Sequence, residues 1–261
     1  MVVNVLSVAG SDPSGGAGIQ ADLKTFAALG AYGMAAITAL TVQNTQGVRA
    51  VHPVDPAVIA AQVEAVLDDV RVDAVKIGML GDAAGIAALA QVLRARRPPV
   101  VVLDPVLVAT SGDALLPGGA VPTLLADLLP LADLVTPNVP EAAALLGVEP
   151  AGDEQEQARQ AAALAALGPA VLLKGGHLGG TESVDVLAGG GSTTRLAAPR
   201  VATTATHGTG CTLSSALAAL RPLHPDWAGT ARAAKAYVSR ALLAGADLDV
   251  GRGHGPLRHD V

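Results

Sequence analysis

The residues VVNVLSV at positions 2–8 form a nearly continuous apolar run. Only Asn4 and Ser7 interrupt this run, and Gly10 follows shortly after its end. A strand that is covered on both faces has this pattern, because neither face then carries a row of polar side chains. The segment Val2–Val8 is therefore predicted to be a buried strand of a parallel sheet.

Similar apolar segments recur along the chain, and Ala- and Leu-rich segments lie between them. Further strands are predicted at Ala35–Val42, Ala74–Gly78, Val100–Asp104, Leu134–Thr136 and Ala170–Lys174, with a hairpin formed by Val184–Ala188 and Thr194–Ala197 around Gly189-Gly190-Gly191. Helices are predicted at Pro56–Val70, Asp82–Arg96, Pro122–Leu129, Pro140–Leu146, Asp153–Leu167, Thr209–Leu220 and Ala228–Ala244.

This alternation of strands and helices predicts an α/β fold with a mostly parallel sheet that is covered by helices on both faces. Ligands of such sheets bind beyond the carboxyl ends of the strands. No low-complexity linker interrupts the pattern. We therefore expect residues 1–261 to form a single domain with its site at one edge of the sheet.

Composition excludes several classes of protein. Hydrophobic residues make up 51% of the 261 residues, which is too many for a disordered chain. Lys and Arg number 17 against 23 Asp and Glu, and this net charge of −6 argues against nucleic acids and anionic membranes as partners. The single cysteine excludes an intrachain disulfide framework and a Cys-rich metal site.

The mean hydropathy of +0.45 raises the question of a membrane span. The uncharged stretch Thr25–Val48 is long enough, but Gly30, Gly33 and several polar residues interrupt it. We interpret it as the end of a helix followed by a buried strand. The N-terminus has no basic residue before its apolar run, unlike a signal peptide, so we expect a cytoplasmic protein.

Two nucleotide-binding motifs are nearly present. Gly16–Ala21 fits G-x-G-x-x-A, but no carboxylate follows at the distance that a dinucleotide ribose requires. Gly18–Thr25 is similar to a P-loop, but Leu23 stands where the second glycine is needed. Neither motif therefore supports a nucleotide site of its usual kind.

The segment Thr206–Thr212 (THGTGCT) predicts an anion-binding helix start. Its small residues allow a ligand to approach the backbone, and the free N–H groups of the following helix favour negative charge. Cys211 lies in the first turn, where a helix N-terminus lowers the pKa of a thiol. A lone Cys is more often a small buried apolar residue, and both interpretations of Cys211 stay open on this evidence.

Several short motifs, spread in order over nearly the whole chain, resemble one family. They are Ala9–Asp22 (AGSDPSGGAGIQAD), Thr41–Thr45, Lys76–Leu80, Asp104–Val106, Ala109–Gly112, Thr136–Asn138, His207–Cys211 and Gly253–Pro256. The chain resembles the hydroxymethylpyrimidine/phosphomethylpyrimidine kinases of the ribokinase-like superfamily. Cys211 makes this resemblance specific, because most ribokinase-like enzymes carry Asp there. It implies a ribokinase-like three-layer sandwich with a mostly parallel central sheet.

The resemblance also implies a set of residues around the pyrimidine ring. These are Gly10, Asp22, Gln43, Met79, Val106 and Cys211. Gln43 suits the role because one amide offers an acceptor and two donors to an aminopyrimidine. Gly15–Gly18 and Val108–Leu116 are expected to be mobile covers that exclude water.

A second set of residues is implied around the phosphates. Asp104 and Glu141, the latter in an N-x-x-E element, would hold Mg²⁺ mainly through water. Lys174, Thr206 and Thr209 would contact ATP. The backbone N–H groups of Gly208, Thr209 and Gly210 would hold the transferring oxygens, and a Cys211 thiolate would accept the proton of the hydroxymethyl group.

The activity implied is phosphorylation of 4-amino-5-hydroxymethyl-2-methylpyrimidine by ATP, first to the monophosphate and then to the diphosphate, in thiamine biosynthesis. Two alternatives stay open: a pyridoxal/pyridoxine kinase of the same superfamily, and a nucleotide-binding regulatory protein without turnover. The resemblance further suggests a homodimer. The histidines do not have the spacing of metal ligands and are expected to have no catalytic role; those considered are His177, His207, His254 and His259.

Overall fold

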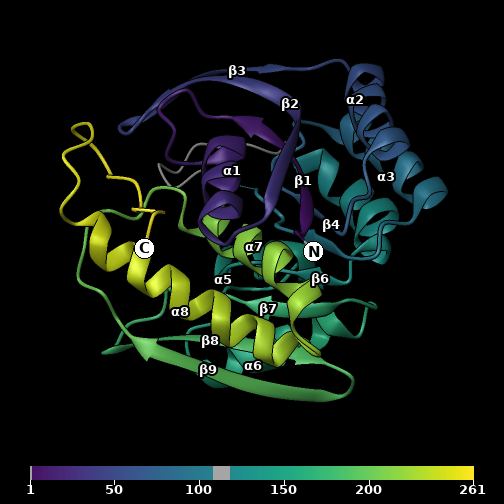
Figure 1. The fold of residues 1–261 in the computed structure, drawn as a ribbon. Coiled ribbons are helices and arrows are strands. Elements are labelled where there is room, and N and C mark those ends of the chain that lie inside the picture. Colours follow the sequence, from purple (N-terminus) through teal and green to yellow (C-terminus); the bar gives the residue numbers. More distant parts are fainter. Residues whose placement is uncertain (1, 108–117) are drawn as a thin grey trace.

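The computed structural model describes residues 2–107 and 118–261, and one nine-stranded sheet runs through it (Figure 1). The strand order is β3-β2-β1-β4-β5-β6-β7-β8-β9. The strands are β1 (Asn4–Ser11), β2 (Tyr32–Asn44), β3 (Gly47–Pro53), β4 (Ala74–Ile77), β5 (Val101–Leu103), β6 (Leu134–Val135), β7 (Ala170–Leu173), β8 (Glu182–Gly189) and β9 (Ser192–Pro199).

The six strands from β2 to β7 in this order are parallel to one another, whereas β3 and β8 are antiparallel to their neighbours. Parallel strands end at the same edge of a sheet, so the segments that follow them converge there. The apolar pattern of residues 2–8 is explained by burial, because every residue from Val5 to Gly10 is buried. The predicted mostly parallel sheet is confirmed.

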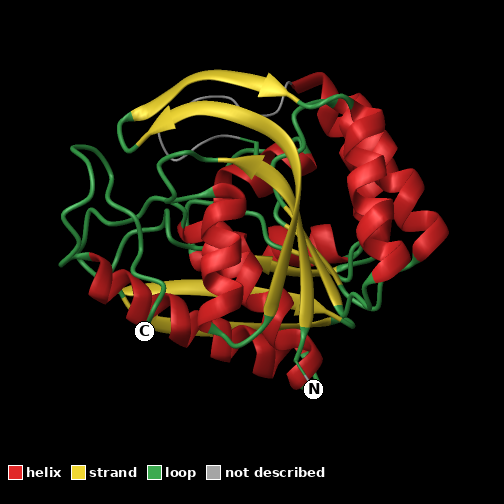
Figure 2. Cartoon of the chain, turned by 45° about the horizontal axis from the view of Figure 1, so that its top comes forward, coloured by secondary structure: helices red, strands yellow, loops and turns green. Residues whose placement is uncertain are grey.

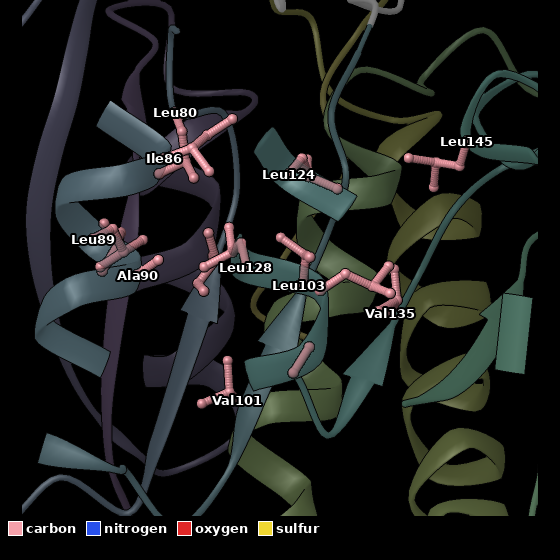
Figure 3. Packing of buried hydrophobic residues seen from close by; sticks show 14 of the residues in the cluster. Leu80, Ile86, Leu89, Ala90, Val101, Leu103, Leu124, Leu128, Val135 and Leu145 are labelled. Atoms are coloured by element: carbon pink, nitrogen blue, oxygen red, sulfur yellow. The ribbon is translucent and has the colours of Figure 1, made fainter. Parts of the chain in front are cut away.

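Helices cover both faces of the sheet. One layer packs around Phe26 and Tyr237 and contains α1 (Gly18–Ala28), α7 (Thr209–Leu220) and α8 (Trp227–Gly245). The other layer contains α2 (Pro56–Asp69), α3 (Ala83–Arg96), α5 (Val139–Leu146) and α6 (Glu154–Ala165). Figure 3 shows how Leu89 of α3 and Val135 of β6 contribute to the apolar core of this second layer.

The helix predicted at Pro122–Leu129 is instead a series of short turns. A single α-helical turn, α4 (Val121–Thr123), is followed by a π-type turn over Leu124–Leu128 and a 3₁₀ turn over Leu129–Leu131. Pro130 lies within the last turn and has no N–H to donate to a regular helix. Leu124 and Leu128 are nevertheless buried, which explains why the apolar spacing indicated a helix.

Strand β3 was not predicted, and β2 extends beyond the predicted end at Val42. The two strands form a long antiparallel hairpin that arches away from the rest of the sheet (Figure 2). The side chains of Leu40 and Val42 on this hairpin are 53% and 47% exposed. Residues 2–107 and 118–261 contain no helix that is both long and apolar enough for a membrane span.

Candidate active site

The anion-binding helix start is built around Gly208, which precedes α7. Gly208 has a φ of 80°, a left-handed conformation that favours glycine. A Cβ at this position would also lie 1.9 Å from the carbonyl oxygen of Gly16. Thr209, one of the three expected donors, gives its N–H to the carbonyl of Thr206 at 3.3 Å, a long hydrogen bond. The first N–H groups of a helix have no partner within the helix, so the first turn of α7 offers donors beside the side chains that line Gly210.

Two carboxylates and one ammonium group lie directly beside this helix start. Asp104 follows β5, Lys174 follows β7, and Glu141 lies in the first turn of α5. Lys174 Nζ is 2.9 Å from Asp104 Oδ1 and 3.9 Å from Glu141 Oε2. A Cβ at Gly210 would lie 3.3 Å from Lys174 Nζ and 3.5 Å from Asp104 Oδ2. The structure therefore brings these three predicted residues together against the anion-binding segment.

Hydrogen bonds hold both carboxylates in place. Asp104 accepts from the hydroxyl groups of Thr136 at 3.0 Å and Ser214 at 3.2 Å. Glu141 Oε2 accepts from the backbone N–H of Asn138 at 2.8 Å, while Asn138 Oδ1 accepts from the backbone N–H of Glu141 at 2.8 Å. This reciprocal capping box explains why an N-x-x-E element starts a helix here.

The two carboxylates differ in their affinity for protons. Burial opposes ionisation of Asp104, but the ammonium groups of Lys174 and Lys76 outweigh it and lower the pKa of Asp104. Burial raises the pKa of Glu141 to about 7, with Lys174 opposing that change and the charge of Asp104 adding to it. A cation beside both groups would favour the ionised form of Glu141.

The donor set fits Mg²⁺. Within residues 2–107 and 118–261, no cluster of three or more His, Cys, Asp or Glu side chains has a metal-binding arrangement. Mg²⁺ is commonly held by one or two carboxylates together with waters and substrate phosphates, rather than by a cage of protein ligands. Asp104 and Glu141 provide such a pair.

The residues expected around the ring come from neighbouring strand ends. Gly10 lies on β1 and Met79 follows β4, and a Cβ at Gly10 would lie 2.4 Å from the Met79 methyl carbon. Gln43 lies near the end of β2, beside a bulge, and its Oε1 accepts from the Thr41 hydroxyl at 3.1 Å. Val106 follows β5 and is partly buried. The absence of a side chain at Gly10 thus leaves room for the Met79 methyl group in its present position.

Asp22 does not present its carboxylate to a pocket. It has no exposed surface, and its two oxygens accept from Lys76 Nζ at 2.9 and 2.8 Å, Ser7 Oγ at 2.6 Å and Ser215 Oγ at 2.7 Å. These donors leave little acceptor capacity for a ring. Lys76 was missed by the sequence analysis as a functional residue, although a lysine within a buried strand was a signal that it needs a charged partner.

The expected direction of the Cys211 pKa is wrong. Cys211 lies in the first turn of α7, as predicted, but burial raises its pKa to about 11. The charges of Asp22 and Asp104 add to this increase, whereas Lys76 and a hydrogen bond from the backbone N–H of Gly18 oppose it. The effect of desolvation on the pKa thus outweighs the opposite effect of the helix N-terminus, and Cys211 is a neutral thiol at neutral pH.

The C-terminal motif folds back onto the site. The His207 N–H donates to the Gly255 carbonyl at 3.0 Å, and the His254 N–H donates to the Thr45 carbonyl at 3.0 Å. This segment thereby joins the β2–β3 turn to the anion-binding segment. Thr206, expected at the nucleotide, has its hydroxyl 3.5 Å from His254 Nδ1. The expected cover Val108–Leu116 lies outside the described residues.

Comparisons with known proteins agree on one family. The family model for phosphomethylpyrimidine kinase matches residues 12–258. A hydroxymethylpyrimidine/phosphomethylpyrimidine kinase of Salmonella typhimurium is 54% identical over 258 residues, which cover 98% of this chain and 97% of that protein. A thiamine biosynthesis bifunctional protein ThiED of Geobacter sulfurreducens is 48% identical, over 98% of this chain and 52% of that protein.

A solved structure extends the similarity to the fold. The pyridoxal kinase of Staphylococcus aureus in complex with AMP-PCP superimposes with a TM-score of 0.91 at 32% identity. The match covers 100% of this chain and 94% of that chain. The similarity therefore includes the whole sheet and both helical layers.

Proposed function

Because the chain belongs to the phosphomethylpyrimidine kinase family, we propose that it phosphorylates 4-amino-5-hydroxymethyl-2-methylpyrimidine with ATP and then phosphorylates the resulting monophosphate, in thiamine biosynthesis. The main observation that supports this proposal is the position of Lys174. Its ammonium group lies at Gly210, in the anion-binding segment, and pairs with Asp104. A positive charge, backbone donors and a carboxylate pair thus converge where a phosphoryl group can be transferred.

Each part of the site has a role in positioning. Gln43, Met79 and Val106 hold the ring, so that its hydroxymethyl group points to the first turn of α7. Backbone N–H groups at residues 208–210 stabilise charge on the transferring oxygens, and Lys174 neutralises charge on ATP, which Thr206 and Thr209 also contact. Phosphoryl transfer needs mainly such positioning and electrostatic stabilisation.

Asp104 and Glu141 are the residues that would hold Mg²⁺. When bound, Mg²⁺ neutralises charge on the phosphates of ATP. The raised pKa of Glu141 supports this role, because a cation is what would bring that carboxyl into its ionised form at neutral pH.

Phosphorylation of pyridoxal is a second candidate activity. The S. aureus pyridoxal kinase has the same overall fold, and pyridoxal also carries a hydroxymethyl group on a six-membered heteroaromatic ring. The intact Asp104–Lys174–Glu141 cluster argues against a regulatory protein without turnover.

We infer a homodimer formed through the β2–β3 hairpin. Leu40 and Val42 leave a strip of apolar surface exposed on β2, which a second copy would cover.

Use of ATP also fits the cytoplasmic location that we expect from the sequence.

A coupled assay of ADP release tests the activity. The purified protein is incubated with ATP, Mg²⁺ and one acceptor at a time: the pyrimidine alcohol, its monophosphate or pyridoxal. We expect turnover with both pyrimidines and less with pyridoxal. The Lys174→Met variant is the control for contaminating kinases. Turnover with pyridoxal alone, or with none of the three, would contradict the proposal.

A further inference from the structure

The geometry points to His207 as a positioning residue that acts through Asp12. The pair holds the glycine loop, residues 13–18, against the anion loop, residues 206–210. This inference rests on the proposed function only in assigning the anion loop to phosphoryl transfer. The contact between the two loops is a property of the structure itself.

One carboxylate organises the glycine loop and also joins it to the anion loop. Asp12 Oδ1 accepts from the backbone N–H and hydroxyl of Ser14 at 2.8 and 2.7 Å. Asp12 Oδ2 accepts from the backbone N–H groups of Gly16 at 3.2 Å and Ala17 at 2.9 Å. The same Oδ2 lies 2.8 Å from His207 Nε2, and both side chains are buried.

The His207 ring is the donor in this contact. The hydrogen bonds from His207 and Ser14 overcome the effect of burial and lower the pKa of Asp12 to about 2. Asp12 is therefore a carboxylate at neutral pH and can only accept, which places a proton on His207 Nε2. On its other side, His207 is fixed by the hydrogen bond between its backbone N–H and Gly255.

The two loops are in contact through their backbones. A Cβ at Gly16 would lie 2.2 Å from His207 Cδ2, and a Cβ at Gly208 would lie 1.9 Å from the Gly16 oxygen. A larger residue at Gly16 would displace the His207 ring, and one at Gly208 would displace the backbone of the glycine loop. The position of Gly208, the residue that precedes α7, therefore depends on the position of the glycine loop.

The glycine loop also contacts two other parts of the site. The backbone N–H of Gly18 lies near enough to the Cys211 thiol to oppose the rise in its pKa. A Cβ at Gly18 would lie 2.3 Å from the carbonyl oxygen of Gly10. If the His207–Asp12 contact is lost, we expect the glycine loop to move, which increases the exposure of the partly buried Cys211 and displaces the start of α7.

The single cysteine of the chain makes loop position measurable without any substrate. We would measure the rate of Cys211 alkylation by iodoacetamide, together with kcat and KM, in His207→Leu, His207→Gln and Asp12→Asn. His207→Leu removes the donor, whereas the amide of His207→Gln can still donate to Asp12. His224→Leu is the matched control, because His224 follows η4 (Arg221–Leu223) at the opposite end of α7.

We expect His207→Leu and Asp12→Asn to speed alkylation severalfold and to lower kcat by about 10- to 100-fold, since a displacement of about 1 Å has effects of this size. KM for the pyrimidine should change little. His207→Gln should restore most of kcat and most of the slow alkylation, and His224→Leu should match the wild type in both. If His207→Leu does not fold, Gly16→Ala displaces the same ring and should also speed alkylation.

Three results separate the possibilities. Unchanged alkylation and unchanged kcat in a folded His207→Leu variant would overturn the inference. Lost kcat with unchanged alkylation would also overturn it, because His207 would then act on the reaction directly. A third result separates the two proposals. If His207→Leu is alkylated faster but the wild type phosphorylates none of the acceptors, the loop contact is supported and the proposed function is contradicted.

Discussion

Lys76 Nζ lies 2.9 and 2.8 Å from the two oxygens of Asp22, and neither side chain has any exposed surface. Ser7 and Ser215 complete the hydrogen bonds of the carboxylate. The pair thus joins β1, α1, β4 and α7 beneath the candidate site. Burial of both charges is tolerated because each is paired and hydrogen-bonded.

The ion pair leads to a prediction about stability. Asp22→Asn should lower the free energy of unfolding by about 3–5 kcal/mol, because the ammonium of Lys76 is then buried without its counter-charge. The double variant Asp22→Asn with Lys76→Met should recover part of that loss. Urea denaturation measures both, with Asp260→Asn at an exposed pair as control. An equal loss for Asp22→Asn and Asp260→Asn would contradict the assignment.

Gln43 leads to a prediction about binding. Gln43→Leu keeps the volume of the side chain but removes its donors and acceptor. Binding of the pyrimidine should weaken by about 1–3 kcal/mol, whereas binding of ATP should be unaffected. Calorimetric titration with each ligand measures this, and Gln46→Leu in the exposed turn is the matched control. Unchanged affinity for the pyrimidine in a folded variant would show that Gln43 does not contact the bound ring.

The carboxylate pair leads to a prediction about Mg²⁺. Asp104→Asn and Glu141→Gln preserve shape but each remove one charge, so the half-saturating Mg²⁺ concentration for turnover should rise by about tenfold or more. Thermal unfolding would show that both variants stay folded. The exposed Glu149 provides a control, Glu149→Gln. If half-saturation is the same in all variants, both carboxylates have only structural roles.

The pKa of Glu141 leads to a prediction about pH. The group ionises near pH 4.5 in the unfolded chain, while in the folded protein its pKa is about 7. Between these values the folded state holds a proton that the unfolded state has released, so the contribution of Glu141 to stability falls as pH rises from 4.5 to 7. Glu141→Gln should remove this part of the pH dependence. Urea denaturation across that range, without Mg²⁺, measures it; parallel curves for wild type and variant would contradict the pKa.

Much of the fold was predictable because burial on both faces leaves a strong pattern. All eight strands predicted between Val2 and Ala197 match strands of the described residues, so that only one of the nine was missed, and the ribokinase-like fold is confirmed. Strand β3 was missed because its half-exposed residues do not form an apolar run. A helix was predicted at Pro122–Leu129, within the turns at 121–131, because the leucines there have helical spacing.

The site was predictable where residues follow strand ends. Asp104 and Lys174 come together because β5 and β7 flank β6 in a parallel sheet. Pairings over long separations could not be found in this way: Asp12 and His207 are 195 residues apart, and Asp22 and Lys76 are 54 apart. The pKa of Cys211 was predicted in the wrong direction because its burial depends on elements distant in the sequence.

The raised pKa of Cys211 leads to a prediction about the two reactions. With a pKa of about 11, only about one thiol in ten thousand is ionised at pH 7, so the thiol is a poor proton acceptor. The first acceptor is an alcohol, which a base would assist. The second is a phosphate monoester, which is mostly ionised at pH 7 and needs no base.

If Cys211 were the base, Cys211→Ala would slow phosphorylation of the alcohol by about 10²–10⁴-fold and spare the monophosphate. We expect comparable losses in both reactions instead, because a neutral thiol acts by contact with the ring and by shaping the first turn of α7. Single-turnover rates for the two acceptors, measured with the same variant, distinguish these outcomes. Cys211→Ser keeps the size and polarity of the group and should lose less than Cys211→Ala in both. A large loss confined to the alcohol would show that the bound substrates lower the pKa of the thiol enough for it to act as the base.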